Sequence, residues 1–144
     1  MGIRDRYKNT TGDYNSASGL QALYSNTTGN YNYAAGRESL FRNTSGTANI
    51  GLGFGTLYSN TTGDYNSASG YLTLYSNTTG SYNFGAGRGA LYNNTTANGN
   101  IAFGYRSLYS TTTGGNNLAA GYQAGYSNQT STGSVFLGYQ AGYY

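Results

Sequence analysis

Residues capable of acid–base or metal chemistry are scarce in this chain of 144 residues. It has no His and no Cys, and its carboxylates are Asp5, Asp13, Glu38 and Asp64. General acid–base catalysis usually needs His or two carboxylates that lie close together, and bound metal ions need a cluster of ligands. Neither pattern is present, so we expect a protein that is not an enzyme and that has no catalytic residue, metal site or cofactor.

The acceptor pattern for N-linked glycans, Asn-x-Ser/Thr, recurs along the chain. Its asparagines are Asn9, Asn26, Asn43, Asn60, Asn77, Asn94 and Asn128. The favoured hypothesis is structural, with Asn and Thr side chains that cap a turn and form ladders between repeats. The alternative is one glycan in each repeat, which would coat a fibre in carbohydrate. A Thr array that matches an ice lattice is a third and less favoured hypothesis, because adjacent threonines on a strand point to opposite faces.

Eighteen tyrosines and a few arginines supply the remaining chemistry. One aromatic position recurs at a constant spacing, as from Tyr7 to Tyr24, and its strictness favours a buried stack of rings over a ligand platform. Tyr105, Tyr122 and Tyr139 lie outside that position and are better candidates for an exposed surface on which sugars could stack. The arginines that could donate hydrogen bonds beside them are Arg37, Arg88 and Arg106. Cell-surface glycans are therefore a candidate partner.

The composition limits both the fold and the partners. Charged residues make up 8% of the chain and aromatic residues 16%, so it lacks the high charge and low aromatic content of disordered segments. The formal net charge is only +3 and no basic stripe is present, so we expect no nucleic-acid partner. No apolar run is long enough to cross a bilayer, so we expect no membrane insertion. Leu, Ile, Val and Phe are too few to fill an ordinary compact core.

A repeat with a period of 17 runs through the chain and decides the expected architecture. Glycine occupies one position of every repeat, at Gly2, Gly19, Gly36, Gly53, Gly70, Gly87, Gly104, Gly121 and Gly138. An aromatic residue occupies another, at Tyr7, Tyr24, Phe41, Tyr58, Tyr75, Tyr92, Tyr109, Tyr126 and Tyr143. We expect both positions to form structural ladders when the repeats stack. The asparagine column from Asn15 to Asn117 is expected to form a hydrogen-bonded ladder as well.

Short β-strands fit this repeat better than helices. Frequent Gly, β-branched Thr, Asn and Tyr oppose a helix, and no apolar period typical of a helix is sustained. We predict one strand centred on residues 14–18 and a second on residues 22–26, with corners at Gly12 and Gly19. About eight such coils, stacked at ~4.8 Å, predict an all-β solenoid, a β-roll or β-helix. It would occupy residues 1–144 as a single tandem-repeat unit without separate domains.

A weaker period of 51 residues overlies the repeat, since DYNSASG occurs at 13–19 and again at 64–70. Duplication of a block of three coils explains it most simply. The alternative is that three successive repeats form inequivalent hairpins around an axis. The sequence begins and stops within the repeat without a polar capping unit. Two interpretations remain open for this, a piece cut from a longer array or ends that pair with another copy.

The strings YNSASGLQALYSNTTG at 14–29 and GYQAGYSNQTSTGSVFLGYQAGY at 121–143 resemble the tandem repeats of bacteriophage tail-fibre proteins and of trimeric autotransporter-type adhesin heads. The resemblance covers essentially the whole chain. It implies a β-solenoid, usually assembled as a homotrimer, that is displayed outside the cell, on the cell surface or on a virion. Ser16, Tyr33 and Phe84 stand where such repeats usually have Val, Ala or Ile. No receptor-binding residue transfers, because the family repeat specifies the scaffold.

Two functional hypotheses follow from these observations. The first is a structural extracellular fibre element, the adhesive shaft or head of a tail-fibre-like or adhesin-like protein. The alternative is a subunit that self-assembles into an extracellular filament, with or without a glycan coat. Both hypotheses make the chain its own partner, either as a homotrimer or as an end-to-end polymer.

Overall fold

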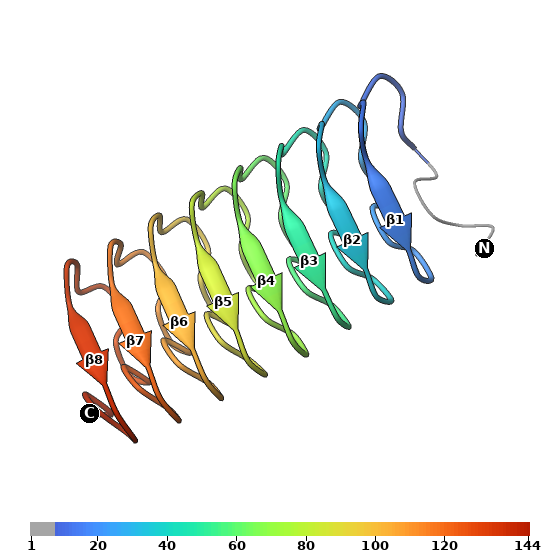
Figure 1. The fold of residues 1–144 in the computed structure, drawn as a ribbon. Helices are drawn as coiled ribbons and strands as arrows, with labels where there is room; N and C mark the ends of the chain where they lie inside the picture. The colour runs from blue at the N-terminus through green and yellow to red at the C-terminus, as the bar shows by residue number, and fades with distance from the viewer. Residues whose placement is uncertain (1–7) are drawn as a thin grey trace.

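The computed structural model describes residues 8–144, which form an all-β solenoid with one short strand in each coil (Figure 1). The strands are β1 (Ser16–Ser18), β2 (Tyr33–Ala35), β3 (Ile50–Leu52), β4 (Ser67–Ser69), β5 (Phe84–Ala86), β6 (Ile101–Phe103), β7 (Leu118–Ala120) and β8 (Val135–Leu137). They form one parallel sheet in the order β1 to β8. Each strand pairs with the next at an offset of one repeat, as Ser16 does with Tyr33. The predicted fold class is confirmed.

Successive repeats occupy equivalent places in the solenoid. The strands follow one another in sequence order without a crossover, and the coils stack in one direction from the first to the last (Figure 1). The hypothesis of three inequivalent hairpins around an axis is therefore wrong. The 51-residue period is a pattern of side chains carried by equivalent coils. No helix in the described part of the chain is long and apolar enough to span a membrane.

The second predicted strand, over residues 22–26, does not form. Leu23 within this segment has left-handed backbone, with a φ of 49°, as does Gln21 just before it, with a φ of 62°, and a strand cannot continue through such residues. The peptide groups are nevertheless paired between coils, because the Leu23 N–H donates to the Ser39 carbonyl at 3.0 Å. The coil therefore turns twice and still keeps its hydrogen bonds parallel to the stacking direction.

The corner after each strand depends on glycine. Gly19 has a φ of 131°, which L-residues rarely adopt. A Cβ there would lie 2.7 Å from both the carbonyl carbon and the carbonyl oxygen of Gly36 in the next coil. The other predicted corner, at Gly12, is equally tight, since a Cβ would lie 2.4 Å from the Gly29 carbonyl oxygen. Close stacking of the coils, more than flexibility, requires these glycines.

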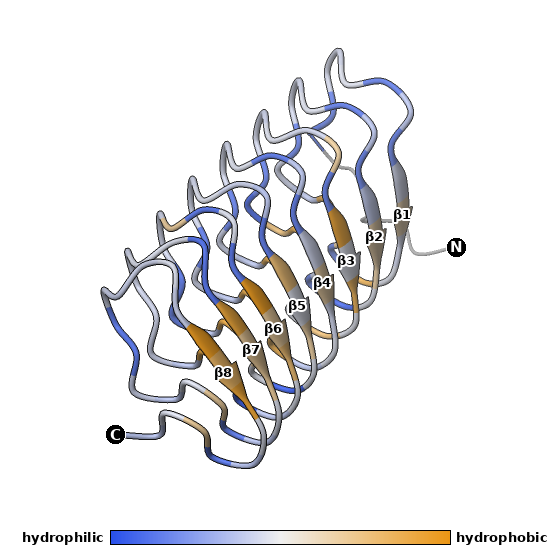
Figure 2. Cartoon of the chain, turned by 60° about the vertical axis from the view of Figure 1, so that its left-hand side comes forward, coloured by the Kyte–Doolittle hydropathy of each residue, from blue (hydrophilic) through white to orange (hydrophobic). Residues whose placement is uncertain are grey.

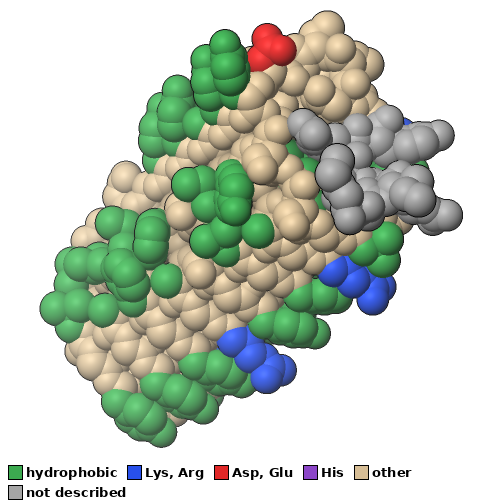
Figure 3. Space-filling model, turned by 45° about the vertical axis from the view of Figure 1, so that its right-hand side comes forward, with side chains coloured by type: hydrophobic (Ala, Val, Ile, Leu, Met, Phe, Trp, Pro, Cys, Tyr) green, Lys and Arg blue, Asp and Glu red, His purple; other side chains and the backbone are tan. Residues whose placement is uncertain are grey.

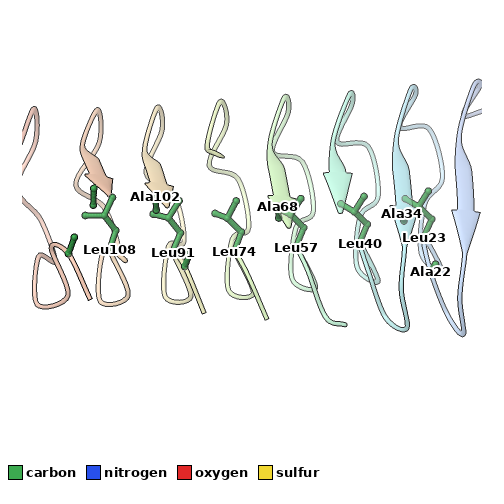
Figure 4. Close-up of a cluster of buried hydrophobic side chains, with 13 residues drawn as sticks. Ala22, Leu23, Ala34, Leu40, Leu57, Ala68, Leu74, Leu91, Ala102 and Leu108 are labelled. Atoms are coloured by element: carbon green, nitrogen blue, oxygen red, sulfur yellow. The ribbon is translucent and has the colours of Figure 1, made fainter. Parts of the chain in front are cut away.

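A single file of leucines forms the apolar core (Figure 4). The fully buried leucines are Leu23, Leu40, Leu57, Leu74, Leu91 and Leu108. They pack against small residues at the middle of each strand, such as Ala34 and Ala68. The expectation that the recurring aromatic residue forms the core is wrong, because those rings lie at the surface and are only half-buried. One leucine and a small residue in each coil suffice, which explains the shortage of aliphatic side chains.

One aromatic residue completes this core at its C-terminal end. In the last coils, Gly125 and Gly142 stand where earlier coils have the buried leucine. Phe136 stands where earlier coils have a small residue at the middle of the strand. A Cβ at Gly125 would lie 2.7 Å from the Phe136 ring, so the ring occupies space that leucine fills in earlier coils. A gain of volume at one position thus compensates for its loss at the other.

Two ladders of buried asparagine line the other interior corner. In the first, the Asn43 side-chain amide donates to Oδ1 of Asn26 at 2.8 Å, and the pattern continues from Asn9 to Asn94. In the second, Oδ1 of Asn15 accepts the backbone N–H of Asn32 at 2.9 Å, as predicted for this column. Both ladders also donate to one shared acceptor, since Asn15 and Asn26 each bond to the Gly29 carbonyl. These bonds satisfy polar groups that water cannot reach.

The first ladder breaks at one residue. Thr111 stands where every other described coil has asparagine, and its hydroxyl donates to the Asn128 carbonyl at 3.0 Å. A threonine hydroxyl does not reach the Asn128 side-chain amide, whose nitrogen is buried without a hydrogen-bond partner. An unsatisfied buried donor costs about 1–3 kcal/mol.

Replacement of Thr111 by Asn should therefore stabilise the protein. The new side chain would offer its Oδ1 to Asn128 and its amide to Asn94, as in the coils before it. We expect the free energy of unfolding to rise by about 1–2 kcal/mol, with a Tm increase of roughly 3–6 °C. Differential scanning calorimetry measures both. Thr113→Asn, the same substitution at an exposed position, is the control, and equal effects of the two changes would contradict the ladder argument.

Candidate functional site

The recurring aromatic residues form a continuous ladder on the outside of the solenoid. From Tyr24 to Tyr143, successive ring centroids lie 5.0–5.3 Å apart and the ring planes are within 22° of parallel. The first members of the two predicted ladders, Tyr7 and Gly2, lie outside the described residues. Because each ring covers the face of the next, a molecule that approaches from the side meets ring edges and phenolic hydroxyls. We call this the main ladder.

A second aromatic column follows the corner glycine and is interrupted. Its stacked rings are Phe54 on Tyr71 at 5.2 Å, Tyr105 on Tyr122 at 5.1 Å, and Tyr122 on Tyr139 at 5.3 Å. Tyr122 and Tyr139 are exposed and Tyr105 is half-buried, so this column lies at the surface, as the sequence predicts. We call it the corner column.

Arg88 occupies the gap in the corner column. Its guanidinium carbon lies 5.4 Å from the Tyr71 ring centroid, so a cation covers the ring face that the next aromatic residue would otherwise cover. In the neighbouring coil the guanidinium of Arg106 lies 5.2 Å from the centroids of both Tyr105 and Tyr109. Arg106 therefore bridges the corner column and the main ladder.

A hollow of about 160 Å³ opens between the two aromatic columns at this point. Its lining residues are Tyr71, Leu72, Arg88, Gly89, Tyr92, Arg106 and Tyr109. Gly89 forms its floor because the residues above and below it in the same column, Leu72 and Arg106, carry long side chains and Gly89 carries none. We call this hollow the arginine pocket.

The two arginines of this pocket have no carboxylate partner within the described residues. The one ion pair found there joins Arg37 to Glu38 at 3.1 Å, in an earlier coil. Figure 3 shows Lys and Arg side chains interleaved with hydrophobic ones along one edge of the molecule, with an acidic side chain at the opposite edge. Within residues 8–144, no carboxylate therefore pairs with the positive charge of Arg88 or Arg106.

The candidate glycan acceptors point into the protein. Asn26, Asn43, Asn60, Asn77 and Asn94 are fully buried, and the amide nitrogen that would carry a glycan donates within the first asparagine ladder. Asn128 is 9% exposed, whereas Asn9 lies at the surface. For the buried acceptors, the alternative hypothesis of one glycan in each repeat is wrong for the folded chain. The structural hypothesis for the same asparagines is confirmed.

The Asn-Thr-Thr corners present a single threonine per coil to solvent. The first threonine is half-buried, and its hydroxyl donates along the stack, as Thr27 does to the Thr44 carbonyl at 2.9 Å. The second, Thr28 in that coil, is exposed. A flat surface of two threonine columns, which the ice-binding hypothesis needs, is therefore not formed by these corners.

The outer face of the sheet is a third distinct surface. The first and third residues of each strand point outward, and many are apolar, including Tyr33, Ile50, Phe103 and Leu137. Figure 2 shows this character over β3 and again from β5 to β8. No charged residue occurs in any of the eight strands. We call this surface the sheet face.

The sequence identifies the three arginines and the exposed tyrosines but not the pocket itself. The two aromatic columns are separated in sequence by four positions, and only the double turn at the left-handed residues makes them the walls of one hollow. The available signal is Gly89, which follows an arginine of the corner column, whereas Gly55 at the same position of its repeat follows Phe54. Among residues 8–144, no group of three or more His, Cys, Asp or Glu lies together.

Comparison with known proteins gives no further guide to this surface. No protein-family model, curated protein or solved structure matches the chain.

A tyrosine of the main ladder makes the protein less stable at alkaline pH. Burial raises the pKa of the Tyr75 hydroxyl above its ordinary value, and charge on Tyr58, Tyr92 and Glu38 raises it further, while Arg42 lowers it. A phenol whose pKa is raised by folding stabilises the protein fully below the unfolded pKa of about 10. That contribution is lost as the pH rises through the folded value.

Tyr75→Phe should therefore leave stability at neutral pH nearly unchanged and move the midpoint of alkaline unfolding to higher pH. The main ladder already contains Phe41, so a ring without a hydroxyl fits the stack. Circular dichroism recorded from about pH 9 to 12 measures the midpoint. The reverse change, Phe41→Tyr, adds an ionisable ring and should lower it. Shifts in the same direction for both variants would contradict the argument.

Proposed function

We propose that this chain is a structural, non-enzymatic element of an extracellular fibre, displayed on a cell surface or a virion, whose outer surfaces make adhesive contacts. One observation carries the proposal: hydrogen bonds of both backbone and buried asparagine run from coil to coil along the stack. Such an arrangement gives a rod whose length grows with the number of repeats. The seven strand pairings span about 34 Å at ~4.8 Å each.

Its lateral surfaces support the adhesive part of the proposal. The main ladder and the corner column place aromatic rims and arginines along the rod, and aromatic residues and Arg are the types most enriched at binding hot spots. They repeat at the coil spacing, so contacts too weak to hold alone can add along the fibre.

The sheet face supports association with further copies of this chain. A contiguous exposed apolar surface is unusual for a protein that works alone. The strands carry no charge for a charged partner to complement, and another copy presents equally uncharged rows at the same spacing. A homotrimer, which the resemblance to adhesin heads implies, would bury this surface.

A filament subunit remains the alternative. Its support is the equivalence of the coils, since β1 to β8 pair in one register and one solenoid could add to another in the same way. Negative-stain microscopy separates the two functions. Discrete rods of uniform length support the fibre element, and long filaments support the alternative. An unfolded chain by circular dichroism would contradict both.

Polar substitutions on the sheet face should dissociate the assembly without unfolding it. The double variant Ile101→Ser and Phe103→Ser reproduces the outward residues of β1 and β4, which are serines. We expect light scattering coupled to size-exclusion chromatography to give a lower mass, with an unchanged circular dichroism spectrum. Ser67→Ala in β4, on the same face, is the control. An unchanged mass in the double variant would rule out this face as the contact between copies.

A further inference from the structure

The arginine pocket is produced by two adjacent departures from the repeat. Arg88 replaces a ring in the corner column, and Gly89 leaves its own column without a side chain between Leu72 and Arg106. The equivalent coil three repeats earlier has the same arginine, Arg37, but fills the next position with Glu38. The chain therefore contains both a filled, neutralised version of this site and an open, positively charged one.

The open version is lined by two guanidinium groups, whose charge and donors suit an anion. The guanidinium groups of Arg88 and Arg106 lie over aromatic rings, with their carbons 5.4 Å from the Tyr71 centroid and 5.2 Å from the Tyr109 centroid, and a ring accepts no more than part of their N–H donors, which leaves the others for a ligand. Planar guanidinium groups bind carboxylates through two parallel hydrogen bonds. The rims of aromatic rings carry partial positive charge, so the edges of Tyr92 and Tyr109 add to the preference for a negative group.

The volume of the pocket and the tyrosines that line it limit what the rest of the ligand can be. A volume of about 160 Å³ is below the ~300 Å³ of typical small-molecule pockets, so it fits one charged group of a molecule that continues along the surface. Tyrosine hydroxyls on the walls both donate and accept hydrogen bonds, which suits neighbouring sugar hydroxyls. Single-stranded nucleic acids instead need open ring faces on which bases stack, and here rings and guanidinium groups cover those faces.

We propose that the arginine pocket binds the carboxylate of an acidic saccharide, with Arg88 and Arg106 on the carboxylate and the tyrosine rims on adjacent hydroxyls. This inference rests on the proposed adhesive function and names the ligand class for it. The shared chemistry is that of a uronic acid, which could be met as a free sugar or as a unit of a polysaccharide.

The test is isothermal titration calorimetry with the full chain and three probes: galacturonate, a short oligogalacturonate, and the same oligomer with its carboxylates methyl-esterified. Binding of the oligomer or of both acidic probes, with at least tenfold weaker binding of the ester, is the expected result. Binding of the monomer as tight as that of the oligomer assigns the site to the free sugar, and tighter oligomer binding assigns it to the polymer. Equal binding of acid and ester, or no binding, overturns the proposal.

Gly89→Glu is the decisive variant, because it copies the filled site at Glu38. Gly89 has a φ of 67° and Glu38 one of 59°, and a Cβ at Gly89 would meet the Arg106 Cγ at an ordinary 3.5 Å. The fold should therefore tolerate the change, while oligogalacturonate binding weakens at least tenfold. Gln140→Glu makes the same charge change in the same column, away from the pocket, and should leave binding unchanged.

The arginines are tested singly. Arg88→Gln and Arg106→Gln should each weaken binding at least tenfold, and Arg88→Lys should recover only part of it, because lysine keeps the charge without the planar fork. Equal weakening by Gln140→Glu and Gly89→Glu would mean a response to net charge alone and would overturn the pocket. Binding of single-stranded DNA as tight as that of oligogalacturonate would also overturn the proposal that the pocket selects an acidic saccharide. Rods seen by microscopy without saccharide binding would remove this inference and leave the fibre proposal intact.

Discussion

Stacking of buried amides in strict register is the constraint on which the rest of this structure depends. Most coils bring two asparagines and a carbonyl, such as that of Gly29, into an interior that water does not reach. A coil within these ladders cannot satisfy these groups alone, because Oδ1 atoms such as those of Asn15 and Asn26 accept hydrogen bonds from the next coil. An inserted or deleted residue would leave several buried polar groups unpaired, at about 1–3 kcal/mol each. The length of the repeat is therefore preserved throughout the described chain.

Because polar ladders fix the register, the apolar core can be very narrow and the outside is free to vary. From Leu23 to Leu108, one leucine per coil fills the interior, and the columns outside it carry serine, tyrosine, isoleucine or arginine without any change of backbone. The 51-residue pattern belongs to this outer layer. Surface chemistry thus changes from coil to coil on a constant scaffold, and the arginine pocket arises where two such changes are adjacent.

Much of the fold can be predicted from the sequence, because glycine, aromatic and asparagine columns report the period directly. The sequence does not predict whether each column faces the interior or the solvent. Alternation along a strand predicts faces only while the backbone is extended, and left-handed residues such as Gln21 and Leu23 interrupt it. For this reason the sequence wrongly predicts a buried main ladder and allows a glycan on the Asn26 column. Arg88 and Arg106 are candidates by type, but their common pocket depends on the same turns.

The break at Thr111 has a consequence for how the molecule comes apart. In a linear array, each coil is held only by its neighbours, so stability is a sum of local terms and opening can stop at a weak junction. The orphaned Asn128 amide and the change from leucine to Gly125 fall in the same coil. The backbone N–H groups from this coil onward, including those of β7 and β8, therefore belong to a cooperative unit that is less protected from hydrogen exchange than β2 to β5. The rod has a built-in point at which its C-terminal coils fray before the rest unfolds.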